Sequence, residues 1–230
     1  MTGVLTLYRS SIGKKAAMAI TGLLMVLFVF VHMIGNLKVY YGPGGTPEPM
    51  LDVYGRFLRE MGYPILGHEQ GLWIARLLLL GAVGLHVWSA IQLTERRWTG
   101  RDVKYVQQKT LQASWASRTM LRGGVIIGLF IIGHLLHLTL GYFVPNFKDG
   151  AVYLNVVSGL KGIAPWLYIF AMLPLGLHIY HGLWSFFQTL GWNSQRSTEL
   201  LRGLALLVAL LVVVGNVSVV LTAMMTTLPS

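Results

Sequence analysis

Most of the histidines in this chain lie in long apolar segments. His178 and His181 fall within residues 162–195, a run that contains no Asp, Glu, Lys or Arg. The other histidines in apolar runs are His32, His86, His134 and His137. An unpaired imidazole is costly in hydrocarbon, so an intramembrane histidine indicates a functional site, most simply a metal ligand or a proton carrier.

The composition is that of a membrane protein. The chain has 230 residues, of which 54% are hydrophobic and only 11% are charged, too apolar for an ordinary soluble domain. Runs long enough to cross a bilayer lie at about residues 16–37, 71–94, 120–142, 162–190 and 203–226. The first run is too long for the apolar core of a signal peptide. We therefore expect an all-α integral membrane protein, a single membrane domain over residues 1–230 with five transmembrane helices.

The connections between these runs differ in character. Residues 37–70 form a long polar connection, in which we expect a short helix at residues 51–61 along the membrane interface. Residues 101–122 are basic and polar, which indicates an extramembrane helix or loop leading into the third span. Residues 143–161 are expected to form a loop.

Basic residues border the spans unevenly. Of the 18 lysines and arginines, twelve fall on the side that holds the N-terminus and six on the opposite side. Because cytoplasmic loops carry the excess of positive charge, we expect a cytoplasmic N-terminus and an external C-terminus. Topology and anionic lipid headgroups also explain the net charge of +10 better than nucleic-acid binding does.

The histidines of the first four spans sort by depth. The first and third spans run outward and the second and fourth run inward, and the histidines come late in each. Late positions lie near the outer surface in the outward spans and near the cytoplasm in the inward spans. The resulting sets are an outer pair, His32 with His134 or His137, and an inner pair, His86 with His178 or His181. This arrangement predicts two bis-histidine sites stacked within a four-helix bundle.

The donor type favours haem b at both sites. The chain has no cysteine, which excludes thiolate-held iron–sulfur clusters and covalently attached haem. Two imidazoles without carboxylates suit haem b better than Zn²⁺, which takes four ligands, or Ca²⁺ and Mg²⁺, which take oxygen. Six-coordinate haems would conduct electrons and leave substrate chemistry elsewhere. Candidates for neutralising haem propionates are Lys14, Lys15, Arg118 and Arg122.

Short motifs around these histidines resemble one family of membrane cytochromes. They are Thr21-Gly22 and the strings VHMIGN at 31–36, LHVW at 85–88, SRTM at 117–120, GHLLH at 133–137 and HIYHGLWSF at 178–186. In this order, over nearly the whole chain, they resemble the single-subunit, five-helix, dihaem cytochrome b that anchors succinate:menaquinone reductases and quinol:fumarate reductases. That protein is the membrane subunit of complex II.

The resemblance implies which histidines bind iron. The implied axial ligands are His32 and His134 for the outer haem and His86 and His178 for the inner haem. In the family, the ligand of the fourth span stands four residues before a Gly-Leu-Trp-Ser-Phe string, which begins here at Gly182. His178 therefore matches the ligand position, and His181 does not.

The third span offers a similar choice. The family's ligand there stands ten residues after a glycine, and Gly124 selects His134 over His137. Histidines three residues apart on a helix differ in height by about 4.5 Å, so both cannot bind one iron. His137 and His181 are then candidates for hydrogen bonds to propionates, to a quinone or to neighbouring side chains.

The resemblance also implies function and partners. Succinate would be oxidised in an FAD-containing flavoprotein subunit, and electrons would pass through an iron–sulfur subunit and then through two b haems of this chain to a quinone, menaquinone in this family. The chain would serve as a subunit of succinate dehydrogenase, lie in the bacterial cytoplasmic membrane and join a higher oligomer of the complex. Its basic face would dock the iron–sulfur subunit.

Quinones bind at the membrane surface in apolar pockets with a few polar groups. Candidates on the cytoplasmic side are Tyr8, Arg9, Ser10, Ser11 and Trp98. Candidates on the outer side are Asn36, Arg56, Arg59, Glu60, His68 and Glu69. All of these residues also suit ordinary roles as interfacial anchors or solvated loop residues.

Three other interpretations remain open. The chain resembles less well the cytochrome b of a formate dehydrogenase or hydrogenase, which predicts other ligand positions. A haem-free, proton-coupled membrane protein is the second alternative, and it would use carboxylates within the spans. A purely structural anchor without cofactors is the third alternative.

One position departs from part of the family. Some fumarate reductases carry a glutamate two residues before the fourth-span ligand, but Gly176 occupies that position here.

Overall fold

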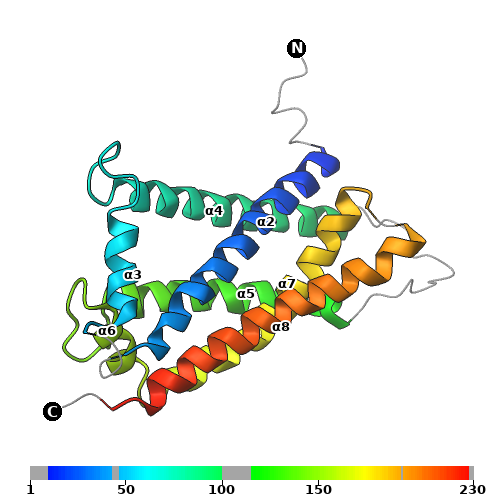
Figure 1. The fold of residues 1–230 in the computed structure, drawn as a ribbon. Coiled ribbons are helices and arrows are strands. Elements are labelled where there is room, and N and C mark those ends of the chain that lie inside the picture. The colour runs from blue at the N-terminus through cyan, green and yellow to red at the C-terminus, as the bar shows by residue number, and fades with distance from the viewer. Residues whose placement is uncertain (1–9, 43–46, 100–114, 193, 228–230) are drawn as a thin grey trace.

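The computed structural model describes residues 10–42, 47–99, 115–192 and 194–227, and all regular structure within them is helical (Figure 1). The elements are α2 (Ser11–Asn36), η1 (Leu37–Tyr40), α3 (Met50–Arg59), α4 (Gln70–Thr99), α5 (Trp115–His134), η2 (Leu135–Thr139), α6 (Val152–Gly159), α7 (Ala164–Thr189) and α8 (Gln195–Met225). The segment η1 is a 3₁₀-helix and η2 is a π-helix.

Five helical segments are long and apolar enough to cross a membrane. They are Ser11–Tyr40, Gln70–Arg96, Thr119–Thr139, Ala164–Thr189 and Ser197–Met225. This finding confirms the predicted all-α fold with five membrane-length helices. The first helix begins earlier than predicted because Ser10 caps it: its hydroxyl accepts a hydrogen bond from the Gly13 amide at 2.9 Å.

One end of the bundle carries extra structure, which we call the cap end. Figure 1 shows α3 and α6 there, close to the end of α2 and to the C-terminal end of α8. Contacts of α3 with α6 and of α6 with α8 hold these elements together. The start of α2 and the turn between α7 and α8 lie at the opposite end, as five alternating passes require.

The helix α6 was not predicted, because residues 143–161 were expected to form a loop. Its N-terminus is fixed by Asp52 of α3, whose carboxylate accepts a hydrogen bond from the Tyr153 amide at 2.8 Å. Its Asn155 side chain exchanges two hydrogen bonds with the backbone of Lys148, at 2.7 and 3.0 Å. The buried side chains of Tyr153 and Val157 pack in one cluster with η1, α3 and α8. Tertiary contacts of this kind stabilise a helix that is too short to form alone.

Charged pairs fasten the cap end. The guanidinium of Arg59 on α3 binds Asp149 at 2.7 Å and Glu69 at 3.3 Å. It therefore joins the segment before α6 to the segment before α4. Arg56 forms a two-pronged ion pair with Glu48. This hydrogen bonding holds the pKa of the Glu48 carboxyl below its usual range.

The long helices pack closely in some pairs and scarcely at all in others. The closest packing joins α7 to α8, where the fully buried Ala205 and the nearly buried Ala209 allow a close approach. Further contacts join α2 to α4, α5 to α7 and α2 to α7. Among the described residues, by contrast, the backbones of α2 and α5 scarcely meet, and the same holds for α4 with α7 and for α4 with α5. The helices that supply each predicted histidine pair are therefore diagonal neighbours.

Candidate functional site

The outer pair comes together across the diagonal between α2 and α5. The ring centroids of His32 and His134 lie 5.9 Å apart, and the ring planes are nearly perpendicular at 85°. An aromatic ring one turn earlier stacks on each imidazole: Phe28 on His32 at 5.3 Å and Phe130 on His134 at 5.8 Å. Both histidines are partly buried.

The inner pair comes together across the other diagonal, between α4 and α7. The ring centroids of His86 and His178 lie 6.2 Å apart, with the planes at 56° to one another. Thr21 of α2 lies beside His86, eleven residues before His32. At 1.5 Å per residue, the two pairs are therefore about 16 Å apart along α2. The outer pair is the one nearer the cap end, because His32 lies in the last turns of α2.

Hydrogen bonds favour one protonated form of His86. The buried hydroxyl of Thr21 donates its single proton to the carbonyl of Ala17, at 2.7 Å. Its oxygen also lies 3.2 Å from His86 Nδ1 and, with that proton donated to Ala17, can accept there. This arrangement is the one that puts the His86 proton on Nδ1 and leaves Nε2 able to bind a metal. Such second contacts also fix the orientation of a ligand histidine.

The outer pair has a corresponding contact that the sequence did not reveal. The hydroxyl of Tyr168 on α7 lies 3.3 Å from His134 Nδ1 and 3.0 Å from His137 Nδ1. Both histidines thus contact Tyr168, and His134 also faces His32. A tyrosine within an apolar span is an ordinary packing residue, so no signal in the sequence separates Tyr168 from the other aromatic residues.

The distances within both pairs fit two axial ligands of one metal ion. An imidazole nitrogen binds a metal at about 2.0 Å, so rings that bind one ion from opposite sides have centroids about 6 Å apart. The planes can take any mutual angle, because each ring can rotate about its metal–nitrogen bond. Within the described residues no group of three or more His, Asp or Glu side chains is close enough to hold a metal. Each pair offers two donors, which suits a metal that brings its other ligands with it, as haem iron does.

Two glycines lie beside the rings of the inner pair. A Cβ atom added to Gly22 would lie 3.4 Å from the His86 ring, and one added to Gly124 would lie 3.6 Å from the His178 ring. Both distances are ordinary van der Waals contacts, so the backbones of α2 and α5 come close to these imidazoles. Among the described residues, His178 Nδ1 is one of two buried side-chain atoms without a hydrogen-bond partner; the other is Gln92 Oε1.

Several other predicted residues have structural partners instead. Ser10 caps α2, and the Ser11 hydroxyl accepts a hydrogen bond from Arg96 at 3.0 Å. Arg9 lies outside the described residues. Among the outer candidates, Arg56 and Arg59 are in ion pairs, and His68 stacks on Tyr63 at 4.9 Å. The role of these residues in binding a quinone stays a prediction.

The remaining candidates are the propionate and second-contact residues. Arg122 is exposed in the early turns of α5, while the side chain of Arg118 lies outside the part of the chain that the structure describes. His181 is partly buried on α7, one turn after His178. Their predicted roles therefore remain predictions.

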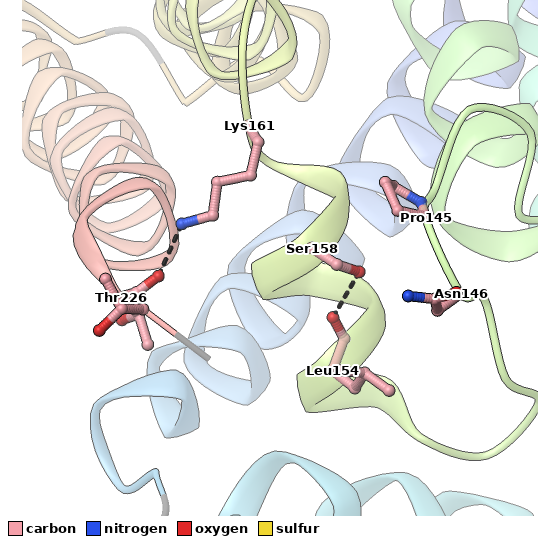
Figure 2. Close-up of a pocket in the computed structure, with 7 residues that line it drawn as sticks. Pro145, Asn146, Leu154, Ser158, Lys161 and Thr226 are labelled. Carbon is pink, nitrogen blue, oxygen red and sulfur yellow. Dashed lines mark hydrogen bonds between the residues drawn. The ribbon is translucent and has the colours of Figure 1, made fainter. Parts of the chain in front are cut away.

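A groove at the cap end contains a lysine that is hydrogen-bonded to backbone carbonyls. It has a volume of about 470 Å³ and is lined by Pro145, Asn146, Leu154, Ser158, Lys161, Thr226 and Thr227 (Figure 2). The Lys161 ammonium donates to the carbonyls of Ala223, Met224 and Thr226 at 2.6–2.9 Å, which uses all three of its protons. This lysine closes the C-terminal end of α8 and has no proton left to donate to a ligand.

Comparison of the chain with protein-family models, with curated proteins and with solved structures gave no match to any of them.

Proposed function

We propose that the chain is the dihaem cytochrome b membrane subunit of a succinate:quinone oxidoreductase. His32 with His134, and His86 with His178, would hold two b haems that relay electrons from an iron–sulfur subunit to menaquinone. The main support is geometric: four helices supply two facing imidazole pairs at two depths, at 5.9 and 6.2 Å. The motifs that resemble this family's anchor subunit supply the choice of partners and substrate.

The residues of the chain would hold and orient the cofactors. Bound haem b supplies reversible one-electron transfer. Thr21 and Tyr168 would accept the Nδ1 protons of His86 and His134, which would leave each Nε2 able to bind iron. Gly22 and Gly124 bring the backbones of α2 and α5 close to the inner rings. In a membrane the apolar helices would exclude water from both pairs, which would limit side reactions at the metal.

The distribution of carboxylates favours electron transfer over proton transport. All eight acidic residues lie in connections or in the first or last turns of the spanning helices. Gly176 occupies the position at which some fumarate reductases carry an intramembrane glutamate. A chain of protonatable groups across the membrane would need carboxylates deep in the spans. We therefore propose succinate oxidation with quinone reduction as the direction.

The distribution of basic residues supports a membrane orientation and a docking surface. The excess of Lys and Arg near the N-terminal side supports a cytoplasmic N-terminus, and the family resemblance supports a bacterial cytoplasmic membrane. The same basic surface would dock the iron–sulfur subunit of the complex through complementary charge. The flavoprotein subunit would bind through that subunit and make no contact with the spans.

A haem assay on the purified full-length chain tests the proposal. A pyridine haemochrome spectrum should show b-type haem at two per chain. His32→Ala, His86→Ala, His134→Ala and His178→Ala should each remove one haem, while His68→Ala, outside the spans, should keep both. A well-folded, haem-free preparation would rule out the electron-transfer role and return these histidines to proton transport or packing.

A further inference from the structure

Tyr168 contacts two histidines through one hydroxyl group. Its oxygen lies 3.3 Å from Nδ1 of His134 and 3.0 Å from Nδ1 of His137. The tyrosine ring itself packs edge-on against Phe130 at 5.1 Å, so the ring is fixed by contacts that do not involve the hydroxyl. The hydroxyl is therefore available for hydrogen bonds with the two imidazoles.

The single hydroxyl proton determines the direction of both hydrogen bonds. A histidine that binds iron through Nε2 carries its proton on Nδ1, so His134 must donate to the Tyr168 oxygen. Tyr168 then donates its own proton to Nδ1 of His137, which leaves the His137 proton on Nε2. The shorter distance to His137 agrees with an O–H donor on that side.

The position of His137 is itself constrained. It lies in the π-helix η2, which begins directly after α5 ends. Turns of π-helix occur often at functional sites. Its Nε2 lies against α6, where a Cβ added to Gly159 would approach it to 3.3 Å. His137 therefore holds the tyrosine hydroxyl from the cap side, and His134 contacts the same hydroxyl from the bundle side.

We propose that Tyr168, held by His137, is a positioning residue that orients His134 and lowers the reduction potential of the outer haem. This inference rests on the proposed function. An acceptor on Nδ1–H makes an imidazole a stronger donor and so stabilises ferric iron. Thr21 does the same for His86 in the inner pair. The two haems are thus tuned separately, by residues on different helices.

The test is a potentiometric titration of the purified holoprotein, followed by optical and electron paramagnetic resonance spectra. Tyr168→Phe keeps the ring and its contact with Phe130 but removes the acceptor. It should raise the ferrous-to-ferric ratio of the outer haem by up to about tenfold at a fixed potential, or about 59 mV. His137→Gln should produce a smaller shift of the same sign, because the hydroxyl then loses only its anchor.

Thr21→Val is the matched control, because it removes the acceptor for His86 and should move only the inner haem. Two bound haems with unchanged potentials in Tyr168→Phe would overturn the role of Tyr168 and leave the proposed function intact. Equal shifts of both haems would also overturn it. A haem-free wild-type chain would overturn the proposed function as well. If Tyr168→Phe retains only the inner haem, the hydroxyl is needed to hold His134 in place, which supports the positioning role.

Discussion

The outer and inner histidine pairs have the same donors but very different surroundings. Aromatic rings stack on both imidazoles of the outer pair, and a tyrosine hydroxyl and a π-helix lie beside it, beneath the cap end. The inner pair has a threonine on one imidazole, glycines close to both, and a buried Nδ1 on His178 without a partner. The outer pair is braced by large side chains, and the inner pair is surrounded by small ones.

This difference shows how one chain can give two similar sites distinct properties. If both pairs bind haem as proposed, their identical ligands would give similar intrinsic chemistry, so a difference in potential would come from neighbouring hydrogen bonds, burial and charge. These neighbours lie at two different depths along the helices: the rings of Phe28 and Phe130 contact the outer pair, and Thr21, Gly22 and Gly124 lie beside the inner pair. A substitution near one pair should therefore leave the other pair unchanged, and three experiments test whether the two pairs are independent.

Double substitutions should have the largest effect. His32→Ala combined with His134→Ala removes both ligands of one pair and should leave one haem per chain, as the single substitutions do. His134→Ala combined with His178→Ala removes one ligand from each pair and should leave none. Haem-to-protein ratios after purification measure both. If the same-pair double variant also loses all haem, the two pairs are not independent sites.

Gly124→Val should have an intermediate effect, confined to the inner pair. The added methyl groups extend beyond a Cβ position that is already 3.6 Å from the His178 ring, and overpacking of this kind costs about 1–3 kcal/mol. Inner haem occupancy and the thermal midpoint of unfolding should both fall. Gly203→Val is the control, because a Cβ there meets nothing within 4 Å. Loss of the outer haem in Gly124→Val would contradict the separation of the two sites.

Glu48→Gln should have the smallest effect and act only through the cap. Arg56 lowers the pKa of Glu48 from its usual value of 4.5, so the ion pair stabilises the fold at neutral pH and is lost as pH falls through the lowered pKa. The thermal midpoint of the variant should lie slightly below that of the wild type at pH 7 and converge with it at acidic pH. A difference between the two that grows on acidification would reverse the expected sign.

The long helices and their number could be read from the sequence because hydropathy and length decide membrane spans almost alone. The histidine pairs followed from depth, since alternating spans bring late residues to alternating ends. The choice between His134 and His137 could not be made in this way, because both lie on one helix and differ only in which neighbours they meet. That choice needed the motif resemblance, and the structure places His134 opposite His32.

The features that the sequence did not reveal depend on contacts between distant segments. The helix α6 is stabilised by Asp52, which precedes it by about a hundred residues, and by backbone bonds of Lys148. Ser10 was a candidate for binding a quinone, although a serine immediately before a helical run is also an ordinary N-cap signal. Tyr168 has no local signal at all, because its partners lie on another helix.

The diagonal placement of the pairs has a consequence for how the protein is made. Each pair joins a helix from the first half of the chain to one from the second half: α2 with α5, and α4 with α7. During synthesis α2 and α4 would be made before either proposed site could form. The outer pair would be complete only after α5 has followed, and the inner pair only after α7. If the pairs bind haem as proposed, cofactor capture would be a late step of biogenesis, and a nascent chain halted before α5 would carry His32 and His86 without their partners.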